Sequence, residues 1–306
     1  MYKQPLISII MNCFNGEEFL CEAIDSVINQ TYSNWELIFW DNLSTDNSKS
    51  IVLSYQDERI KYYKAGKRTN LGEARALAYN KITGEMLTIL DCDDIWMQNK
   101  LSEQVKYFKQ EEVGICYSNT IFFSHKNQMK LYTDDIRIND STDSLITNYH
   151  ISLETVMLRV RDLKKLEKAF DPDYSHISDF DLITRLSKVT KIVYVPKTLA
   201  MYRIHAQSEG NKKPRLFDIE KLKWAKCNLV NNLFSYEKMA LEELLRIIKA
   251  KTRMESLFPS YKDMKDLFFN YKIRKNHLFV ILSFIPIVGY ISMKFRNYLY
   301  NKKWLY

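Results

Sequence analysis

Strand-like and helix-like segments alternate four times within the first ninety residues, and this alternation restricts the fold more than any other feature of the sequence. Short apolar runs with high β propensity cover residues 6–11, 35–40, 60–63 and 86–90. Segments with the apolar spacing of amphipathic helices follow at residues 19–28, 51–55 and 73–82. Repeated strand–helix–strand units form a parallel sheet, which binds ligands beyond the carboxyl ends of its strands. The sequence therefore predicts an α/β fold with a mostly parallel central sheet.

Polar residues stand at the carboxyl ends of these strands. The first strand leads into Asn12–Asn15, the second ends in Asp41, and the fourth is followed by Asp91-Cys92-Asp93-Asp94. Three carboxylates in four positions repel one another unless a cation lies among them. Mg²⁺ or Mn²⁺ would suit carboxylate oxygens, and a diphosphate could complete the coordination shell. The alternative is a solvated acidic turn that caps the next helix. After Asp41 we expect Ser44 or Thr45 to cap a helix in the same way.

The composition indicates a folded protein of a reducing compartment. With 306 residues, 46% of them hydrophobic, the chain can bury a sizeable core, which excludes a disordered or fibrous protein. Its five cysteines are an odd number and form no Cys-x-x-Cys pair, which argues against a disulfide framework and a thiolate zinc site. The first residues show no secretory signal pattern. We therefore expect a cytoplasmic protein.

The net charge of +8 is unevenly distributed along the chain. Residues 1–220 carry 28 basic and 31 acidic side chains, a net charge of −3, whereas residues 221–306 carry 17 and 6, a net charge of +11. An acidic part suits a metal or another cation, and a basic part suits a polyanion. We therefore expect two functional parts.

An ordered set of motifs over residues 5–210 resembles the family 2 glycosyltransferases of the GT-A type. The motifs are Ile7–Asn15, Ala23–Tyr32, Asp41 with Ser44-Thr45-Asp46, Asn70–Arg75, Gly84-Glu85, Asp91–Asp94, Phe170-Asp171, Ser178–Leu182 with Arg185-Leu186, and Leu199–His205. The resemblance implies a Rossmann-like GT-A catalytic domain over residues 1–212. It also implies inverting sugar transfer in the biosynthesis of a bacterial surface polysaccharide or glycolipid.

The same resemblance assigns nucleotide-binding roles to individual residues. In similar enzymes the loop after the first strand holds a uracil or thymine base, so Asn12 would contact the base and the Phe14 ring would stack on it. Asp41 would bind the base or ribose, and Arg75 the nucleotide or its phosphates. Asp91 and Asp93 match the two ends of an Asp-x-Asp motif, with Asp91 toward the ribose. The implied nucleotide-binding set is Asn12, Phe14, Asn15, Asp41, Arg75, Asp91, Cys92 and Asp93.

A metal ion and a catalytic base complete the implied site. Asp93 or the adjacent Asp94 would bind Mn²⁺ or Mg²⁺, with His205 as a further ligand. The metal would stabilise the departing diphosphate, and Asp179 would deprotonate the acceptor hydroxyl. Without the resemblance, Asp179 would first be interpreted as the N-cap of a helix, and His205 as a structural histidine.

The chain departs from the family pattern at three places. Asn42 and Leu43 follow Asp41, where the family usually has an acidic residue and a glycine, and this bears on the ribose contacts. Phe14 replaces the commoner tyrosine, which keeps the stacking surface but loses a hydroxyl. Ser178 stands where a glutamate often precedes the catalytic aspartate.

The expected function is that of a metal-dependent hexosyl- or N-acetylhexosaminyl-transferase, with a UDP-sugar or similar donor and a saccharide or lipid-linked acceptor. A catalytically silent sugar-nucleotide-binding protein is one alternative, although it would lose the base or a metal ligand. A nucleic-acid-binding protein is another, but the basic excess is not interleaved with aromatic residues in the part that carries the motifs. A dehydrogenase is disfavoured because residues 12–16 lack the glycine-rich phosphate loop.

Residues 213–306 are expected to form a basic, mostly helical extension. The apolar spacing predicts helices at 216–234 and 236–254, and residues 278–293 contain no charge. A helix of these sixteen residues would span about 24 Å, short of the roughly 30 Å of a hydrocarbon core. We therefore expect an in-plane anchor on an anionic membrane surface, which would make the protein peripheral on the inner face of the cell membrane. A buried core helix is the alternative.

Overall fold

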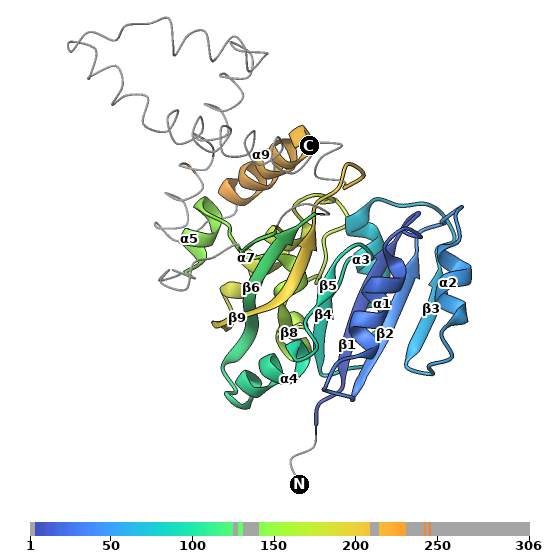
Figure 1. The fold of residues 1–306 in the computed structure, drawn as a ribbon. Coiled ribbons are helices and arrows are strands. Elements are labelled where there is room, and N and C mark those ends of the chain that lie inside the picture. Colours follow the sequence, from blue (N-terminus) through green and yellow to red (C-terminus); the bar gives the residue numbers. More distant parts are fainter. Residues whose placement is uncertain are drawn as a thin grey trace, which may run out of the picture. The chain divides into compact units, whose positions relative to one another are not determined.

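The computed structural model describes residues 4–124, 128–130, 141–208 and 214–230, together with the single positions 242 and 245. The chain divides into two compact units, Met1–Glu220 and Lys221–Tyr306. The first unit contains a β-sheet with helices on both faces (Figure 1). This is the α/β architecture that the alternation of segments predicts.

The sheet combines the four expected parallel strands with a mixed second half. In the described residues its strand order is β3-β2-β1-β4-β8-β6-β9-β5, with β7 paired to β6. β1 pairs in parallel with β2 and β4, and β2 with β3, so the carboxyl ends of these strands lie along one edge. The strands are β1 (Ile7–Cys13), β2 (Trp35–Asp41), β3 (Ile60–Lys64), β4 (Met86–Ile89), β5 (Ile95–Trp96), β6 (Val113–Phe123), β7 (Gln128–Lys130), β8 (Met157–Arg159) and β9 (Lys191–Arg203).

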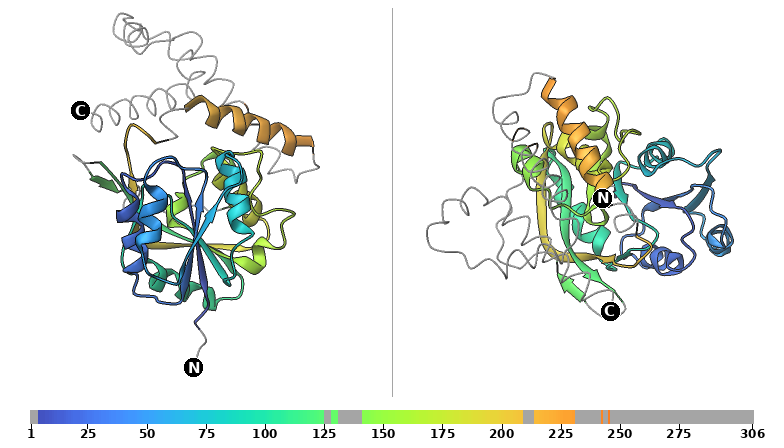
Figure 2. Two further views of the ribbon diagram at one scale, coloured as in Figure 1. Left: turned by 90° about the vertical axis from the view of Figure 1, so that its right-hand side faces the viewer. Right: turned by 90° about the horizontal axis from the view of Figure 1, so that it is seen from above.

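Helices of the described residues cover both faces of this sheet. The helices of the described residues are α1 (Leu20–Ile28), α2 (Ser48–Ser54), α3 (Leu71–Tyr79), α4 (Lys100–Gln104), α5 (Thr142–Thr147), α6 (Val160–Leu163), α7 (Ser178–Ser187) and α9 (Pro214–Val230), with short 3₁₀ turns at Val105–Lys109 and Leu153–Thr155. α9 runs beyond the first unit and is not counted among the helices on the sheet. In the right-hand view of Figure 2, α3 lies on one side of the blue strands, and α1 and α2 lie on the other.

The alternation of side chains along β1 explains why two cores form. Ile9 packs with Ile24 of α1 in one buried cluster, whereas the next residue, Ile10, packs with Ala78 of α3 in a second cluster. Leu182 of α7 belongs to this second cluster, so α7 covers the same face as α3. Both helices therefore approach the carboxyl edge of the strands from one side.

The start of α2 differs from the expectation. The helix begins at Ser48 without a side-chain cap, so the prediction that Ser44 or Thr45 caps it is wrong. The Ser44 hydroxyl instead accepts a hydrogen bond from the backbone N–H of Asn15, at 3.0 Å. Its oxygen joins the loop after β2 to the loop after β1.

The second half of the sheet rests on the two longest strands, β6 and β9. They pair in parallel, with register shifts around Asn119. β5 pairs antiparallel with the edge of β9 that faces away from β6, and the backbone N–H of Trp96 donates to Ser26 Oγ of α1 at 3.2 Å. The sheet therefore curves until its last strand lies against α1.

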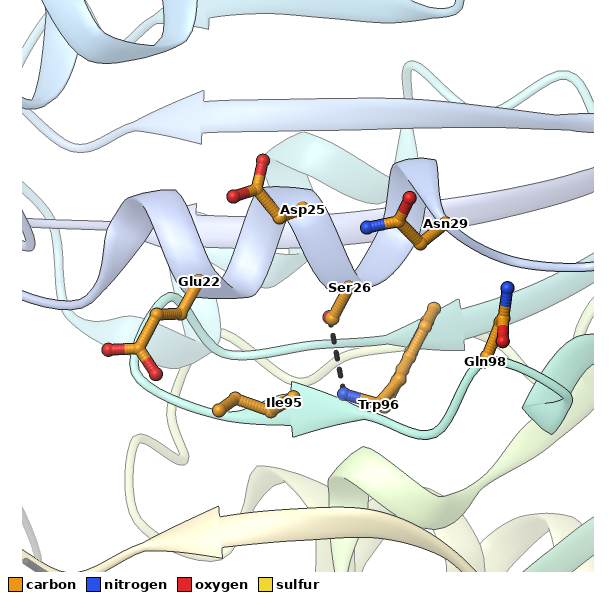
Figure 3. A pocket seen from close by; sticks show the side chains of 7 residues that line it. All are labelled: Glu22, Asp25, Ser26, Asn29, Ile95, Trp96 and Gln98. Atoms are coloured by element: carbon orange, nitrogen blue, oxygen red, sulfur yellow. Dashed lines mark hydrogen bonds between the residues drawn. The ribbon is translucent and has the colours of Figure 1, made fainter.

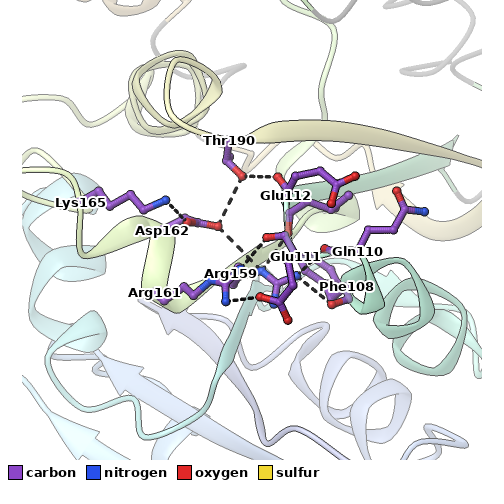
Figure 4. A network of polar contacts seen from close by, with 10 residues as sticks. Phe108, Gln110, Glu111, Glu112, Arg159, Arg161, Asp162, Lys165 and Thr190 are labelled. Atoms are coloured by element: carbon purple, nitrogen blue, oxygen red, sulfur yellow. Dashed lines mark hydrogen bonds and ion pairs between the residues drawn. The ribbon is translucent and has the colours of Figure 1, made fainter.

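A buried arginine holds the start of β6 through a network of hydrogen bonds. Arg159, at the end of β8, is 7% exposed and donates to the carbonyl oxygens of Val113, Phe108 and Gln110 at 2.9, 2.8 and 2.9 Å. Its Nε lies 3.8 Å from Asp162 Oδ2, as Figure 4 shows. This network fixes the turn that leads into β6, at the edge remote from the strand ends that carry the predicted site.

The basic extension is described only at its beginning. α9 begins two residues before the helix expected at 216–234, overlaps it up to Val230 and crosses the boundary between the two compact units. The helix expected at 236–254, apart from positions 242 and 245, and the segment 278–293 lie outside the described residues. Within the described ranges, no helix has both the length and the apolar character needed to cross a membrane.

Candidate active site

Three predicted residues come together because their strands are neighbours. Asn12 lies near the end of β1, Asp41 ends β2, and Asp91 follows β4, while β1 lies between the other two strands. Asn12 is in register with Trp40, so both side chains point to the α3 face, whereas Asp41 shares the opposite face with Cys13. The carboxyl edge thus presents polar groups on both faces.

The Asn12 carboxamide is an unsatisfied polar group at this edge. The side chain is 6% exposed, and neither Oδ1 nor Nδ2 has a hydrogen-bond partner in the part of the chain that the structure describes. The indole N–H of Trp40, in register with it, also lacks a partner within these residues. Leaving such groups buried and unpaired costs about 1–3 kcal/mol each. The edge is therefore prepared to hydrogen-bond a ligand or water.

Asp41 and Asn15 are engaged by the protein itself. The Asp41 side chain is 1% exposed, and its carboxylate accepts from the Ser44 N–H at 2.7 Å and from the Tyr62 hydroxyl at 2.6 Å. Asn15 has a φ of 54°, and its Oδ1 accepts from the Thr45 N–H at 2.8 Å. Both predicted nucleotide contacts thus also hold the loops after β1 and β2.

Phe14 lies in the loop after β1, as the stacking role requires, but a cation already covers its ring. The Arg68 guanidinium carbon is 3.5 Å from the ring centroid. Arg68 belongs to the loop between β3 and α3, and no sequence signal distinguishes it from its basic neighbours Lys67 and Lys64. A planar ligand that stacked on Phe14 would therefore have to displace Arg68 or use the opposite face of the ring.

Cys92 faces Cys13 at the root of the first loop. A Cβ atom at Gly16 would lie 2.8 Å from Cys92 Sγ and 2.9 Å from Cys13 Sγ, so both thiols crowd the Gly16 backbone. The thiol contact with Cys92 lowers the pKa of Cys13, and the same contact, with burial, raises the pKa of Cys92. Cys92 therefore packs between the Asp-x-Asp segment and β1.

Arg75 connects the Asp-x-Asp segment to α7. Its side chain is 4% exposed; one terminal nitrogen donates to Ser178 Oγ at 2.5 Å, and the other to the Asp91 carboxylate oxygens at 3.2 and 3.3 Å. Desolvation raises the pKa of Asp91, the Arg75 charge opposes this, and the Asp93 charge adds to it. Ser178, which replaces the family's common glutamate, thus holds the arginine with a neutral hydroxyl.

Asp93 and His205 form a pair, and Asp94 does not join it. His205 Nε2 lies 2.9 Å from Asp93 Oδ2, and the edge of the imidazole packs on Phe19 at 4.9 Å between ring centroids. Asp94 is 2% exposed and accepts the backbone N–H of Arg203 at 2.8 Å. Burial, together with the Asp93 charge, raises the pKa of Asp94 well above its usual range.

Arg203, the last residue of β9, holds the Asp91–Asp94 segment by contacts with Asp93 and Asp94, which we call the Arg203 clasp. Its Nε donates to the Asp93 carbonyl oxygen at 2.8 Å, and its Nη2 to Glu22 of α1 at 2.9 Å. The guanidinium carbon lies 4.3 Å from the ring centroid of Phe19. Arg203 has no role that the sequence alone predicts; its one signal is its place in the Leu199–His205 motif, two residues before His205.

Asp179 lies in the first turn of α7 and is half-buried. The N-cap position of this helix belongs to Ile177, so the alternative role of Asp179 as the N-cap is not what the structure has. Asp181, two residues further along α7, pairs with Arg185 at 2.6 Å. Asp179 directly follows Ser178, the residue that Arg75 binds. The contact between Arg75 and Ser178 thus connects the first turn of α7 to Asp91.

A shallow groove between α1 and β5 contains none of the predicted site residues. It is lined by Glu22, Asp25, Ser26, Asn29, Ile95, Trp96 and Gln98 (Figure 3). In the described part of the chain, no group of three or more histidine, cysteine, aspartate or glutamate side chains could by itself hold a metal ion. The Asp93–His205 pair is thus a candidate metal site only if a ligand supplies further donor atoms.

The sequence matches a known protein family and several named proteins. The sequence model of the family described as "Glycosyl transferase family 2" matches residues 8–170. The Escherichia coli protein named UDP-Glc:alpha-D-GlcNAc-diphosphoundecaprenol beta-1,3-glucosyltransferase WfgD is 30% identical over 187 residues, which cover 61% of this chain and 72% of WfgD. The similarly named WfaP of Escherichia coli is 26% identical over 68% of this chain and 81% of its own length.

Solved structures show the same fold at low sequence identity. Residues 1–349 of S. aureus TarS, in complex with UDP-GlcNAc, match with a TM-score of 0.62 and 16% identity, covering 84% of this chain and 77% of that one. The mannosyltransferase PcManGT from Pyrobaculum calidifontis, in complex with GDP-Man and Mn²⁺, matches with a TM-score of 0.61 and 15% identity over 89% and 82%. The fold is that of the GT-A glycosyltransferases, as the resemblance implied.

Proposed function

Because the chain belongs to glycosyl transferase family 2 and is a glycosyltransferase, we propose that it transfers a hexosyl or N-acetylhexosaminyl group from a UDP-sugar to a lipid-linked saccharide, with inversion at the anomeric carbon. The observation that carries the proposal is the Asp93–His205 pair beside the carboxyl edge of β1 and β4. A carboxylate and an imidazole at this edge suit the metal-bound diphosphate of such a donor.

The Asn12 carboxamide, which has no partner among the described residues, can pair with uracil. The amide offers one acceptor and two donor hydrogens, and the imide edge of uracil offers an N–H beside carbonyl oxygens. The Phe14 ring, two residues after Asn12, would support the base by stacking. WfgD and WfaP are named for UDP-Glc, and the TarS structure holds UDP-GlcNAc, which adds support for a uridine nucleotide.

Mn²⁺ or Mg²⁺ fits the donor atoms of this pair. Asp93 Oδ2 and His205 Nε2 would hold the ion, whereas Asp94 is committed to the Arg203 backbone. The ion, when bound, would neutralise charge on the departing diphosphate. Arg203 and Phe19 hold the two ligands in place, and Arg75 keeps Asp91 directed along the same edge.

Asp179 is the proposed base for the acceptor hydroxyl. The Ser178–Arg75–Asp91 contacts connect the start of α7 to the Asp-x-Asp segment, so the base and the donor share one rigid support. A base held in line with the reacting hydroxyl contributes about 10²–10⁴-fold to the rate.

Asp179→Asn tests this assignment. With Mn²⁺ and a panel of nucleotide sugars, the wild-type chain should hydrolyse one UDP-sugar slowly. It should also transfer the sugar of this donor to a GlcNAc-diphospho-lipid, with release of UDP. Asp179→Asn should lower both rates by about 10²-fold or more, and UDP affinity measured by calorimetry should stay within twofold. Asp143→Asn, which changes an exposed carboxylate in the first turn of α5, is the control. Failure of the wild-type chain to bind any nucleoside diphosphate would refute the proposed function.

We further propose that the protein works at the inner face of the cell membrane. The acceptor named for WfgD and WfaP is a diphosphoundecaprenol, and residues 221–306 of this chain carry a net charge of +11. The full-length chain should sediment with vesicles containing phosphatidylglycerol and should be released by about 0.5 M salt. Equal sedimentation with neutral vesicles would contradict the electrostatic part of this proposal.

A further inference from the structure

The Glu220 carboxylate binds three consecutive backbone N–H groups in the segment that leads into α7. Glu220 Oε1 accepts from Ser175 at 3.1 Å, and Oε2 accepts from His176 at 2.8 Å and from Ile177 at 3.1 Å. The Glu220 side chain is 8% exposed, and residues 175–177 are buried or half-buried. Three charge-assisted bonds to one buried carboxylate define the path of this segment more strongly than neutral bonds would.

No residue within α7 performs this task. Ile177 is the N-cap residue and has no side chain that could accept a hydrogen bond from the first turn. The backbone N–H groups at a helix start need acceptors, and the helix dipole favours a negative charge there. Glu220, 43 residues after Ile177, accepts from this N-cap residue and from the two residues before it, and its charge adds to those of Asp179 and Asp181 in the first turn.

The α3 helix holds the other side of the same segment. Asn70 Nδ2 donates to the Pro172 carbonyl oxygen at 2.9 Å, and the Leu71 N–H donates to Ser175 Oγ at 3.4 Å. A Cβ atom at Gly72 would lie only 2.1 Å from the Tyr174 carbonyl oxygen, so the two backbones touch. Residues 171–177 are thus fixed between the start of α3 and the Glu220 carboxylate.

We propose that Glu220 is a positioning residue for the transfer reaction: it fixes the start of α7, and with it the side chain of Asp179. The inference rests on the proposed role of Asp179 as the base. Glu220 lies 50 residues beyond the last residue matched by the family model, and it is the last residue of the first compact unit. The catalytic unit therefore depends on the first turns of α9 for the geometry of its base.

Most of the donor side lies away from this contact. The groups proposed to hold the base and the metal come from β1, β2, the loop after β4 and the end of β9, and among the proposed nucleotide-binding residues Arg75 binds α7, through Ser178. Removal of the Glu220 carboxylate should therefore lower the turnover number far more than the donor affinity, which the Arg75–Ser178 contact alone connects to α7. A displacement of the base by about 1 Å is enough to cost about 100-fold in rate.

The test compares Glu220→Ala and Glu220→Gln with wild type. The readouts are the rate of UDP release from the UDP-sugar that the wild-type chain hydrolyses fastest, the KM for that sugar, and UDP affinity. We expect kcat to fall by about 10–100-fold in Glu220→Ala and less in Glu220→Gln, whose amide oxygen still accepts hydrogen bonds, with KM and UDP affinity within twofold. Glu112→Gln, at an exposed position, is the matched control and should behave as wild type.

Hydrogen exchange separates this role from a loss of folding. In Glu220→Ala the amides of residues 175–177 should exchange at least tenfold faster, while those of β1 and β4 keep their protection. Wild-type kcat in a folded Glu220→Ala variant would overturn the inference, and so would an unchanged kcat with a raised donor KM. If the wild-type chain neither binds UDP nor hydrolyses a UDP-sugar, the proposed function itself fails.

Discussion

Lys100 offers a quantitative test of the core beneath the Asp-x-Asp segment. The side chain is fully buried, and its ammonium group donates to Gln104 Oε1 at 2.8 Å, to Thr88 Oγ1 at 3.0 Å and to the Val156 carbonyl oxygen at 3.4 Å. All three acceptors are uncharged, and the nitrogen lies 4.2 Å from the Trp96 ring centroid. Burial lowers the pKa of Lys100 to about 7, although the nearby Cys116 and Glu154 oppose the shift.

The sign of the effect follows from proton uptake on unfolding. Lys100 has a pKa of about 7 in the folded protein and 10.5 in its ordinary state, so between these values the unfolded chain binds the proton more strongly. The free energy of unfolding therefore rises with pH over this range. Integration between pH 6 and pH 9 gives a rise of about 2.5 kcal/mol from this one group, with a limiting slope of about 1.4 kcal/mol per pH unit.

Lys100→Met removes the titrating group and keeps a flexible chain of similar length. Urea unfolding of both proteins at pH 6, 7.5 and 9 would measure the difference in their free energies of unfolding. The stability of the variant relative to wild type should fall by about 2.5 kcal/mol between pH 6 and 9, whatever its value at one pH. Lys106→Met, at a lysine that is 58% exposed, is the control and should show no such trend. A pH-independent difference for Lys100→Met would refute the reasoning.

Three further changes test other parts of the structure. Gly16→Ala would place a Cβ 2.8 Å from Cys92 Sγ, so UDP affinity measured by calorimetry should fall at least tenfold, whereas Gly66→Ala, with no atom within 4 Å, should not change it. Arg159→Met would leave three carbonyl oxygens without their donor, although Asp162 keeps its ion pair with Lys165 at 2.6 Å. The free energy of unfolding measured in urea should fall by about 3 kcal/mol, against less than about 0.5 kcal/mol for the exposed Arg161→Met. Asp93→Asn should abolish the Mn²⁺-dependent part of UDP binding, while Asp94→Asn, which keeps the acceptor for Arg203, should retain it; the reverse result would exchange their roles.

The strands of the first half were predictable because their pattern is local. The apolar runs predicted at 6–11, 35–40, 60–63 and 86–90 correspond to β1 to β4, and their parallel order follows from the helices between them. The cap of α2 was not predictable from neighbours, because the Ser44 hydroxyl is used by Asn15, 29 residues earlier. Local patterns thus give the elements, and loop-to-loop bonds decide their ends.

The site shows the same division between local and distant information. The positions of Asn12, Asp41 and Asp91 at one edge follow from strand order alone. The different surroundings of Asp93 and Asp94 depend on Arg203, about 110 residues later, whose backbone N–H donates a hydrogen bond to the Asp94 carboxyl group. No spacing rule could give this information, since the two aspartates are adjacent in the sequence and both carry a carboxylate that suits a metal ion.

The Arg203 clasp has a consequence for any attempt to exchange donor specificity by recombining related enzymes. Residues 8–94 look like a self-contained cassette, but the Asp-x-Asp segment is held at Asp93 and Asp94 by an arginine from the end of β9, which also pairs with α1. In a chimera that transplants only the first segment, Asp93 and Asp94 would come from one enzyme and the arginine that contacts them from another. The smallest interchangeable module therefore consists of two pieces of chain, residues 8–94 together with residues 203–205.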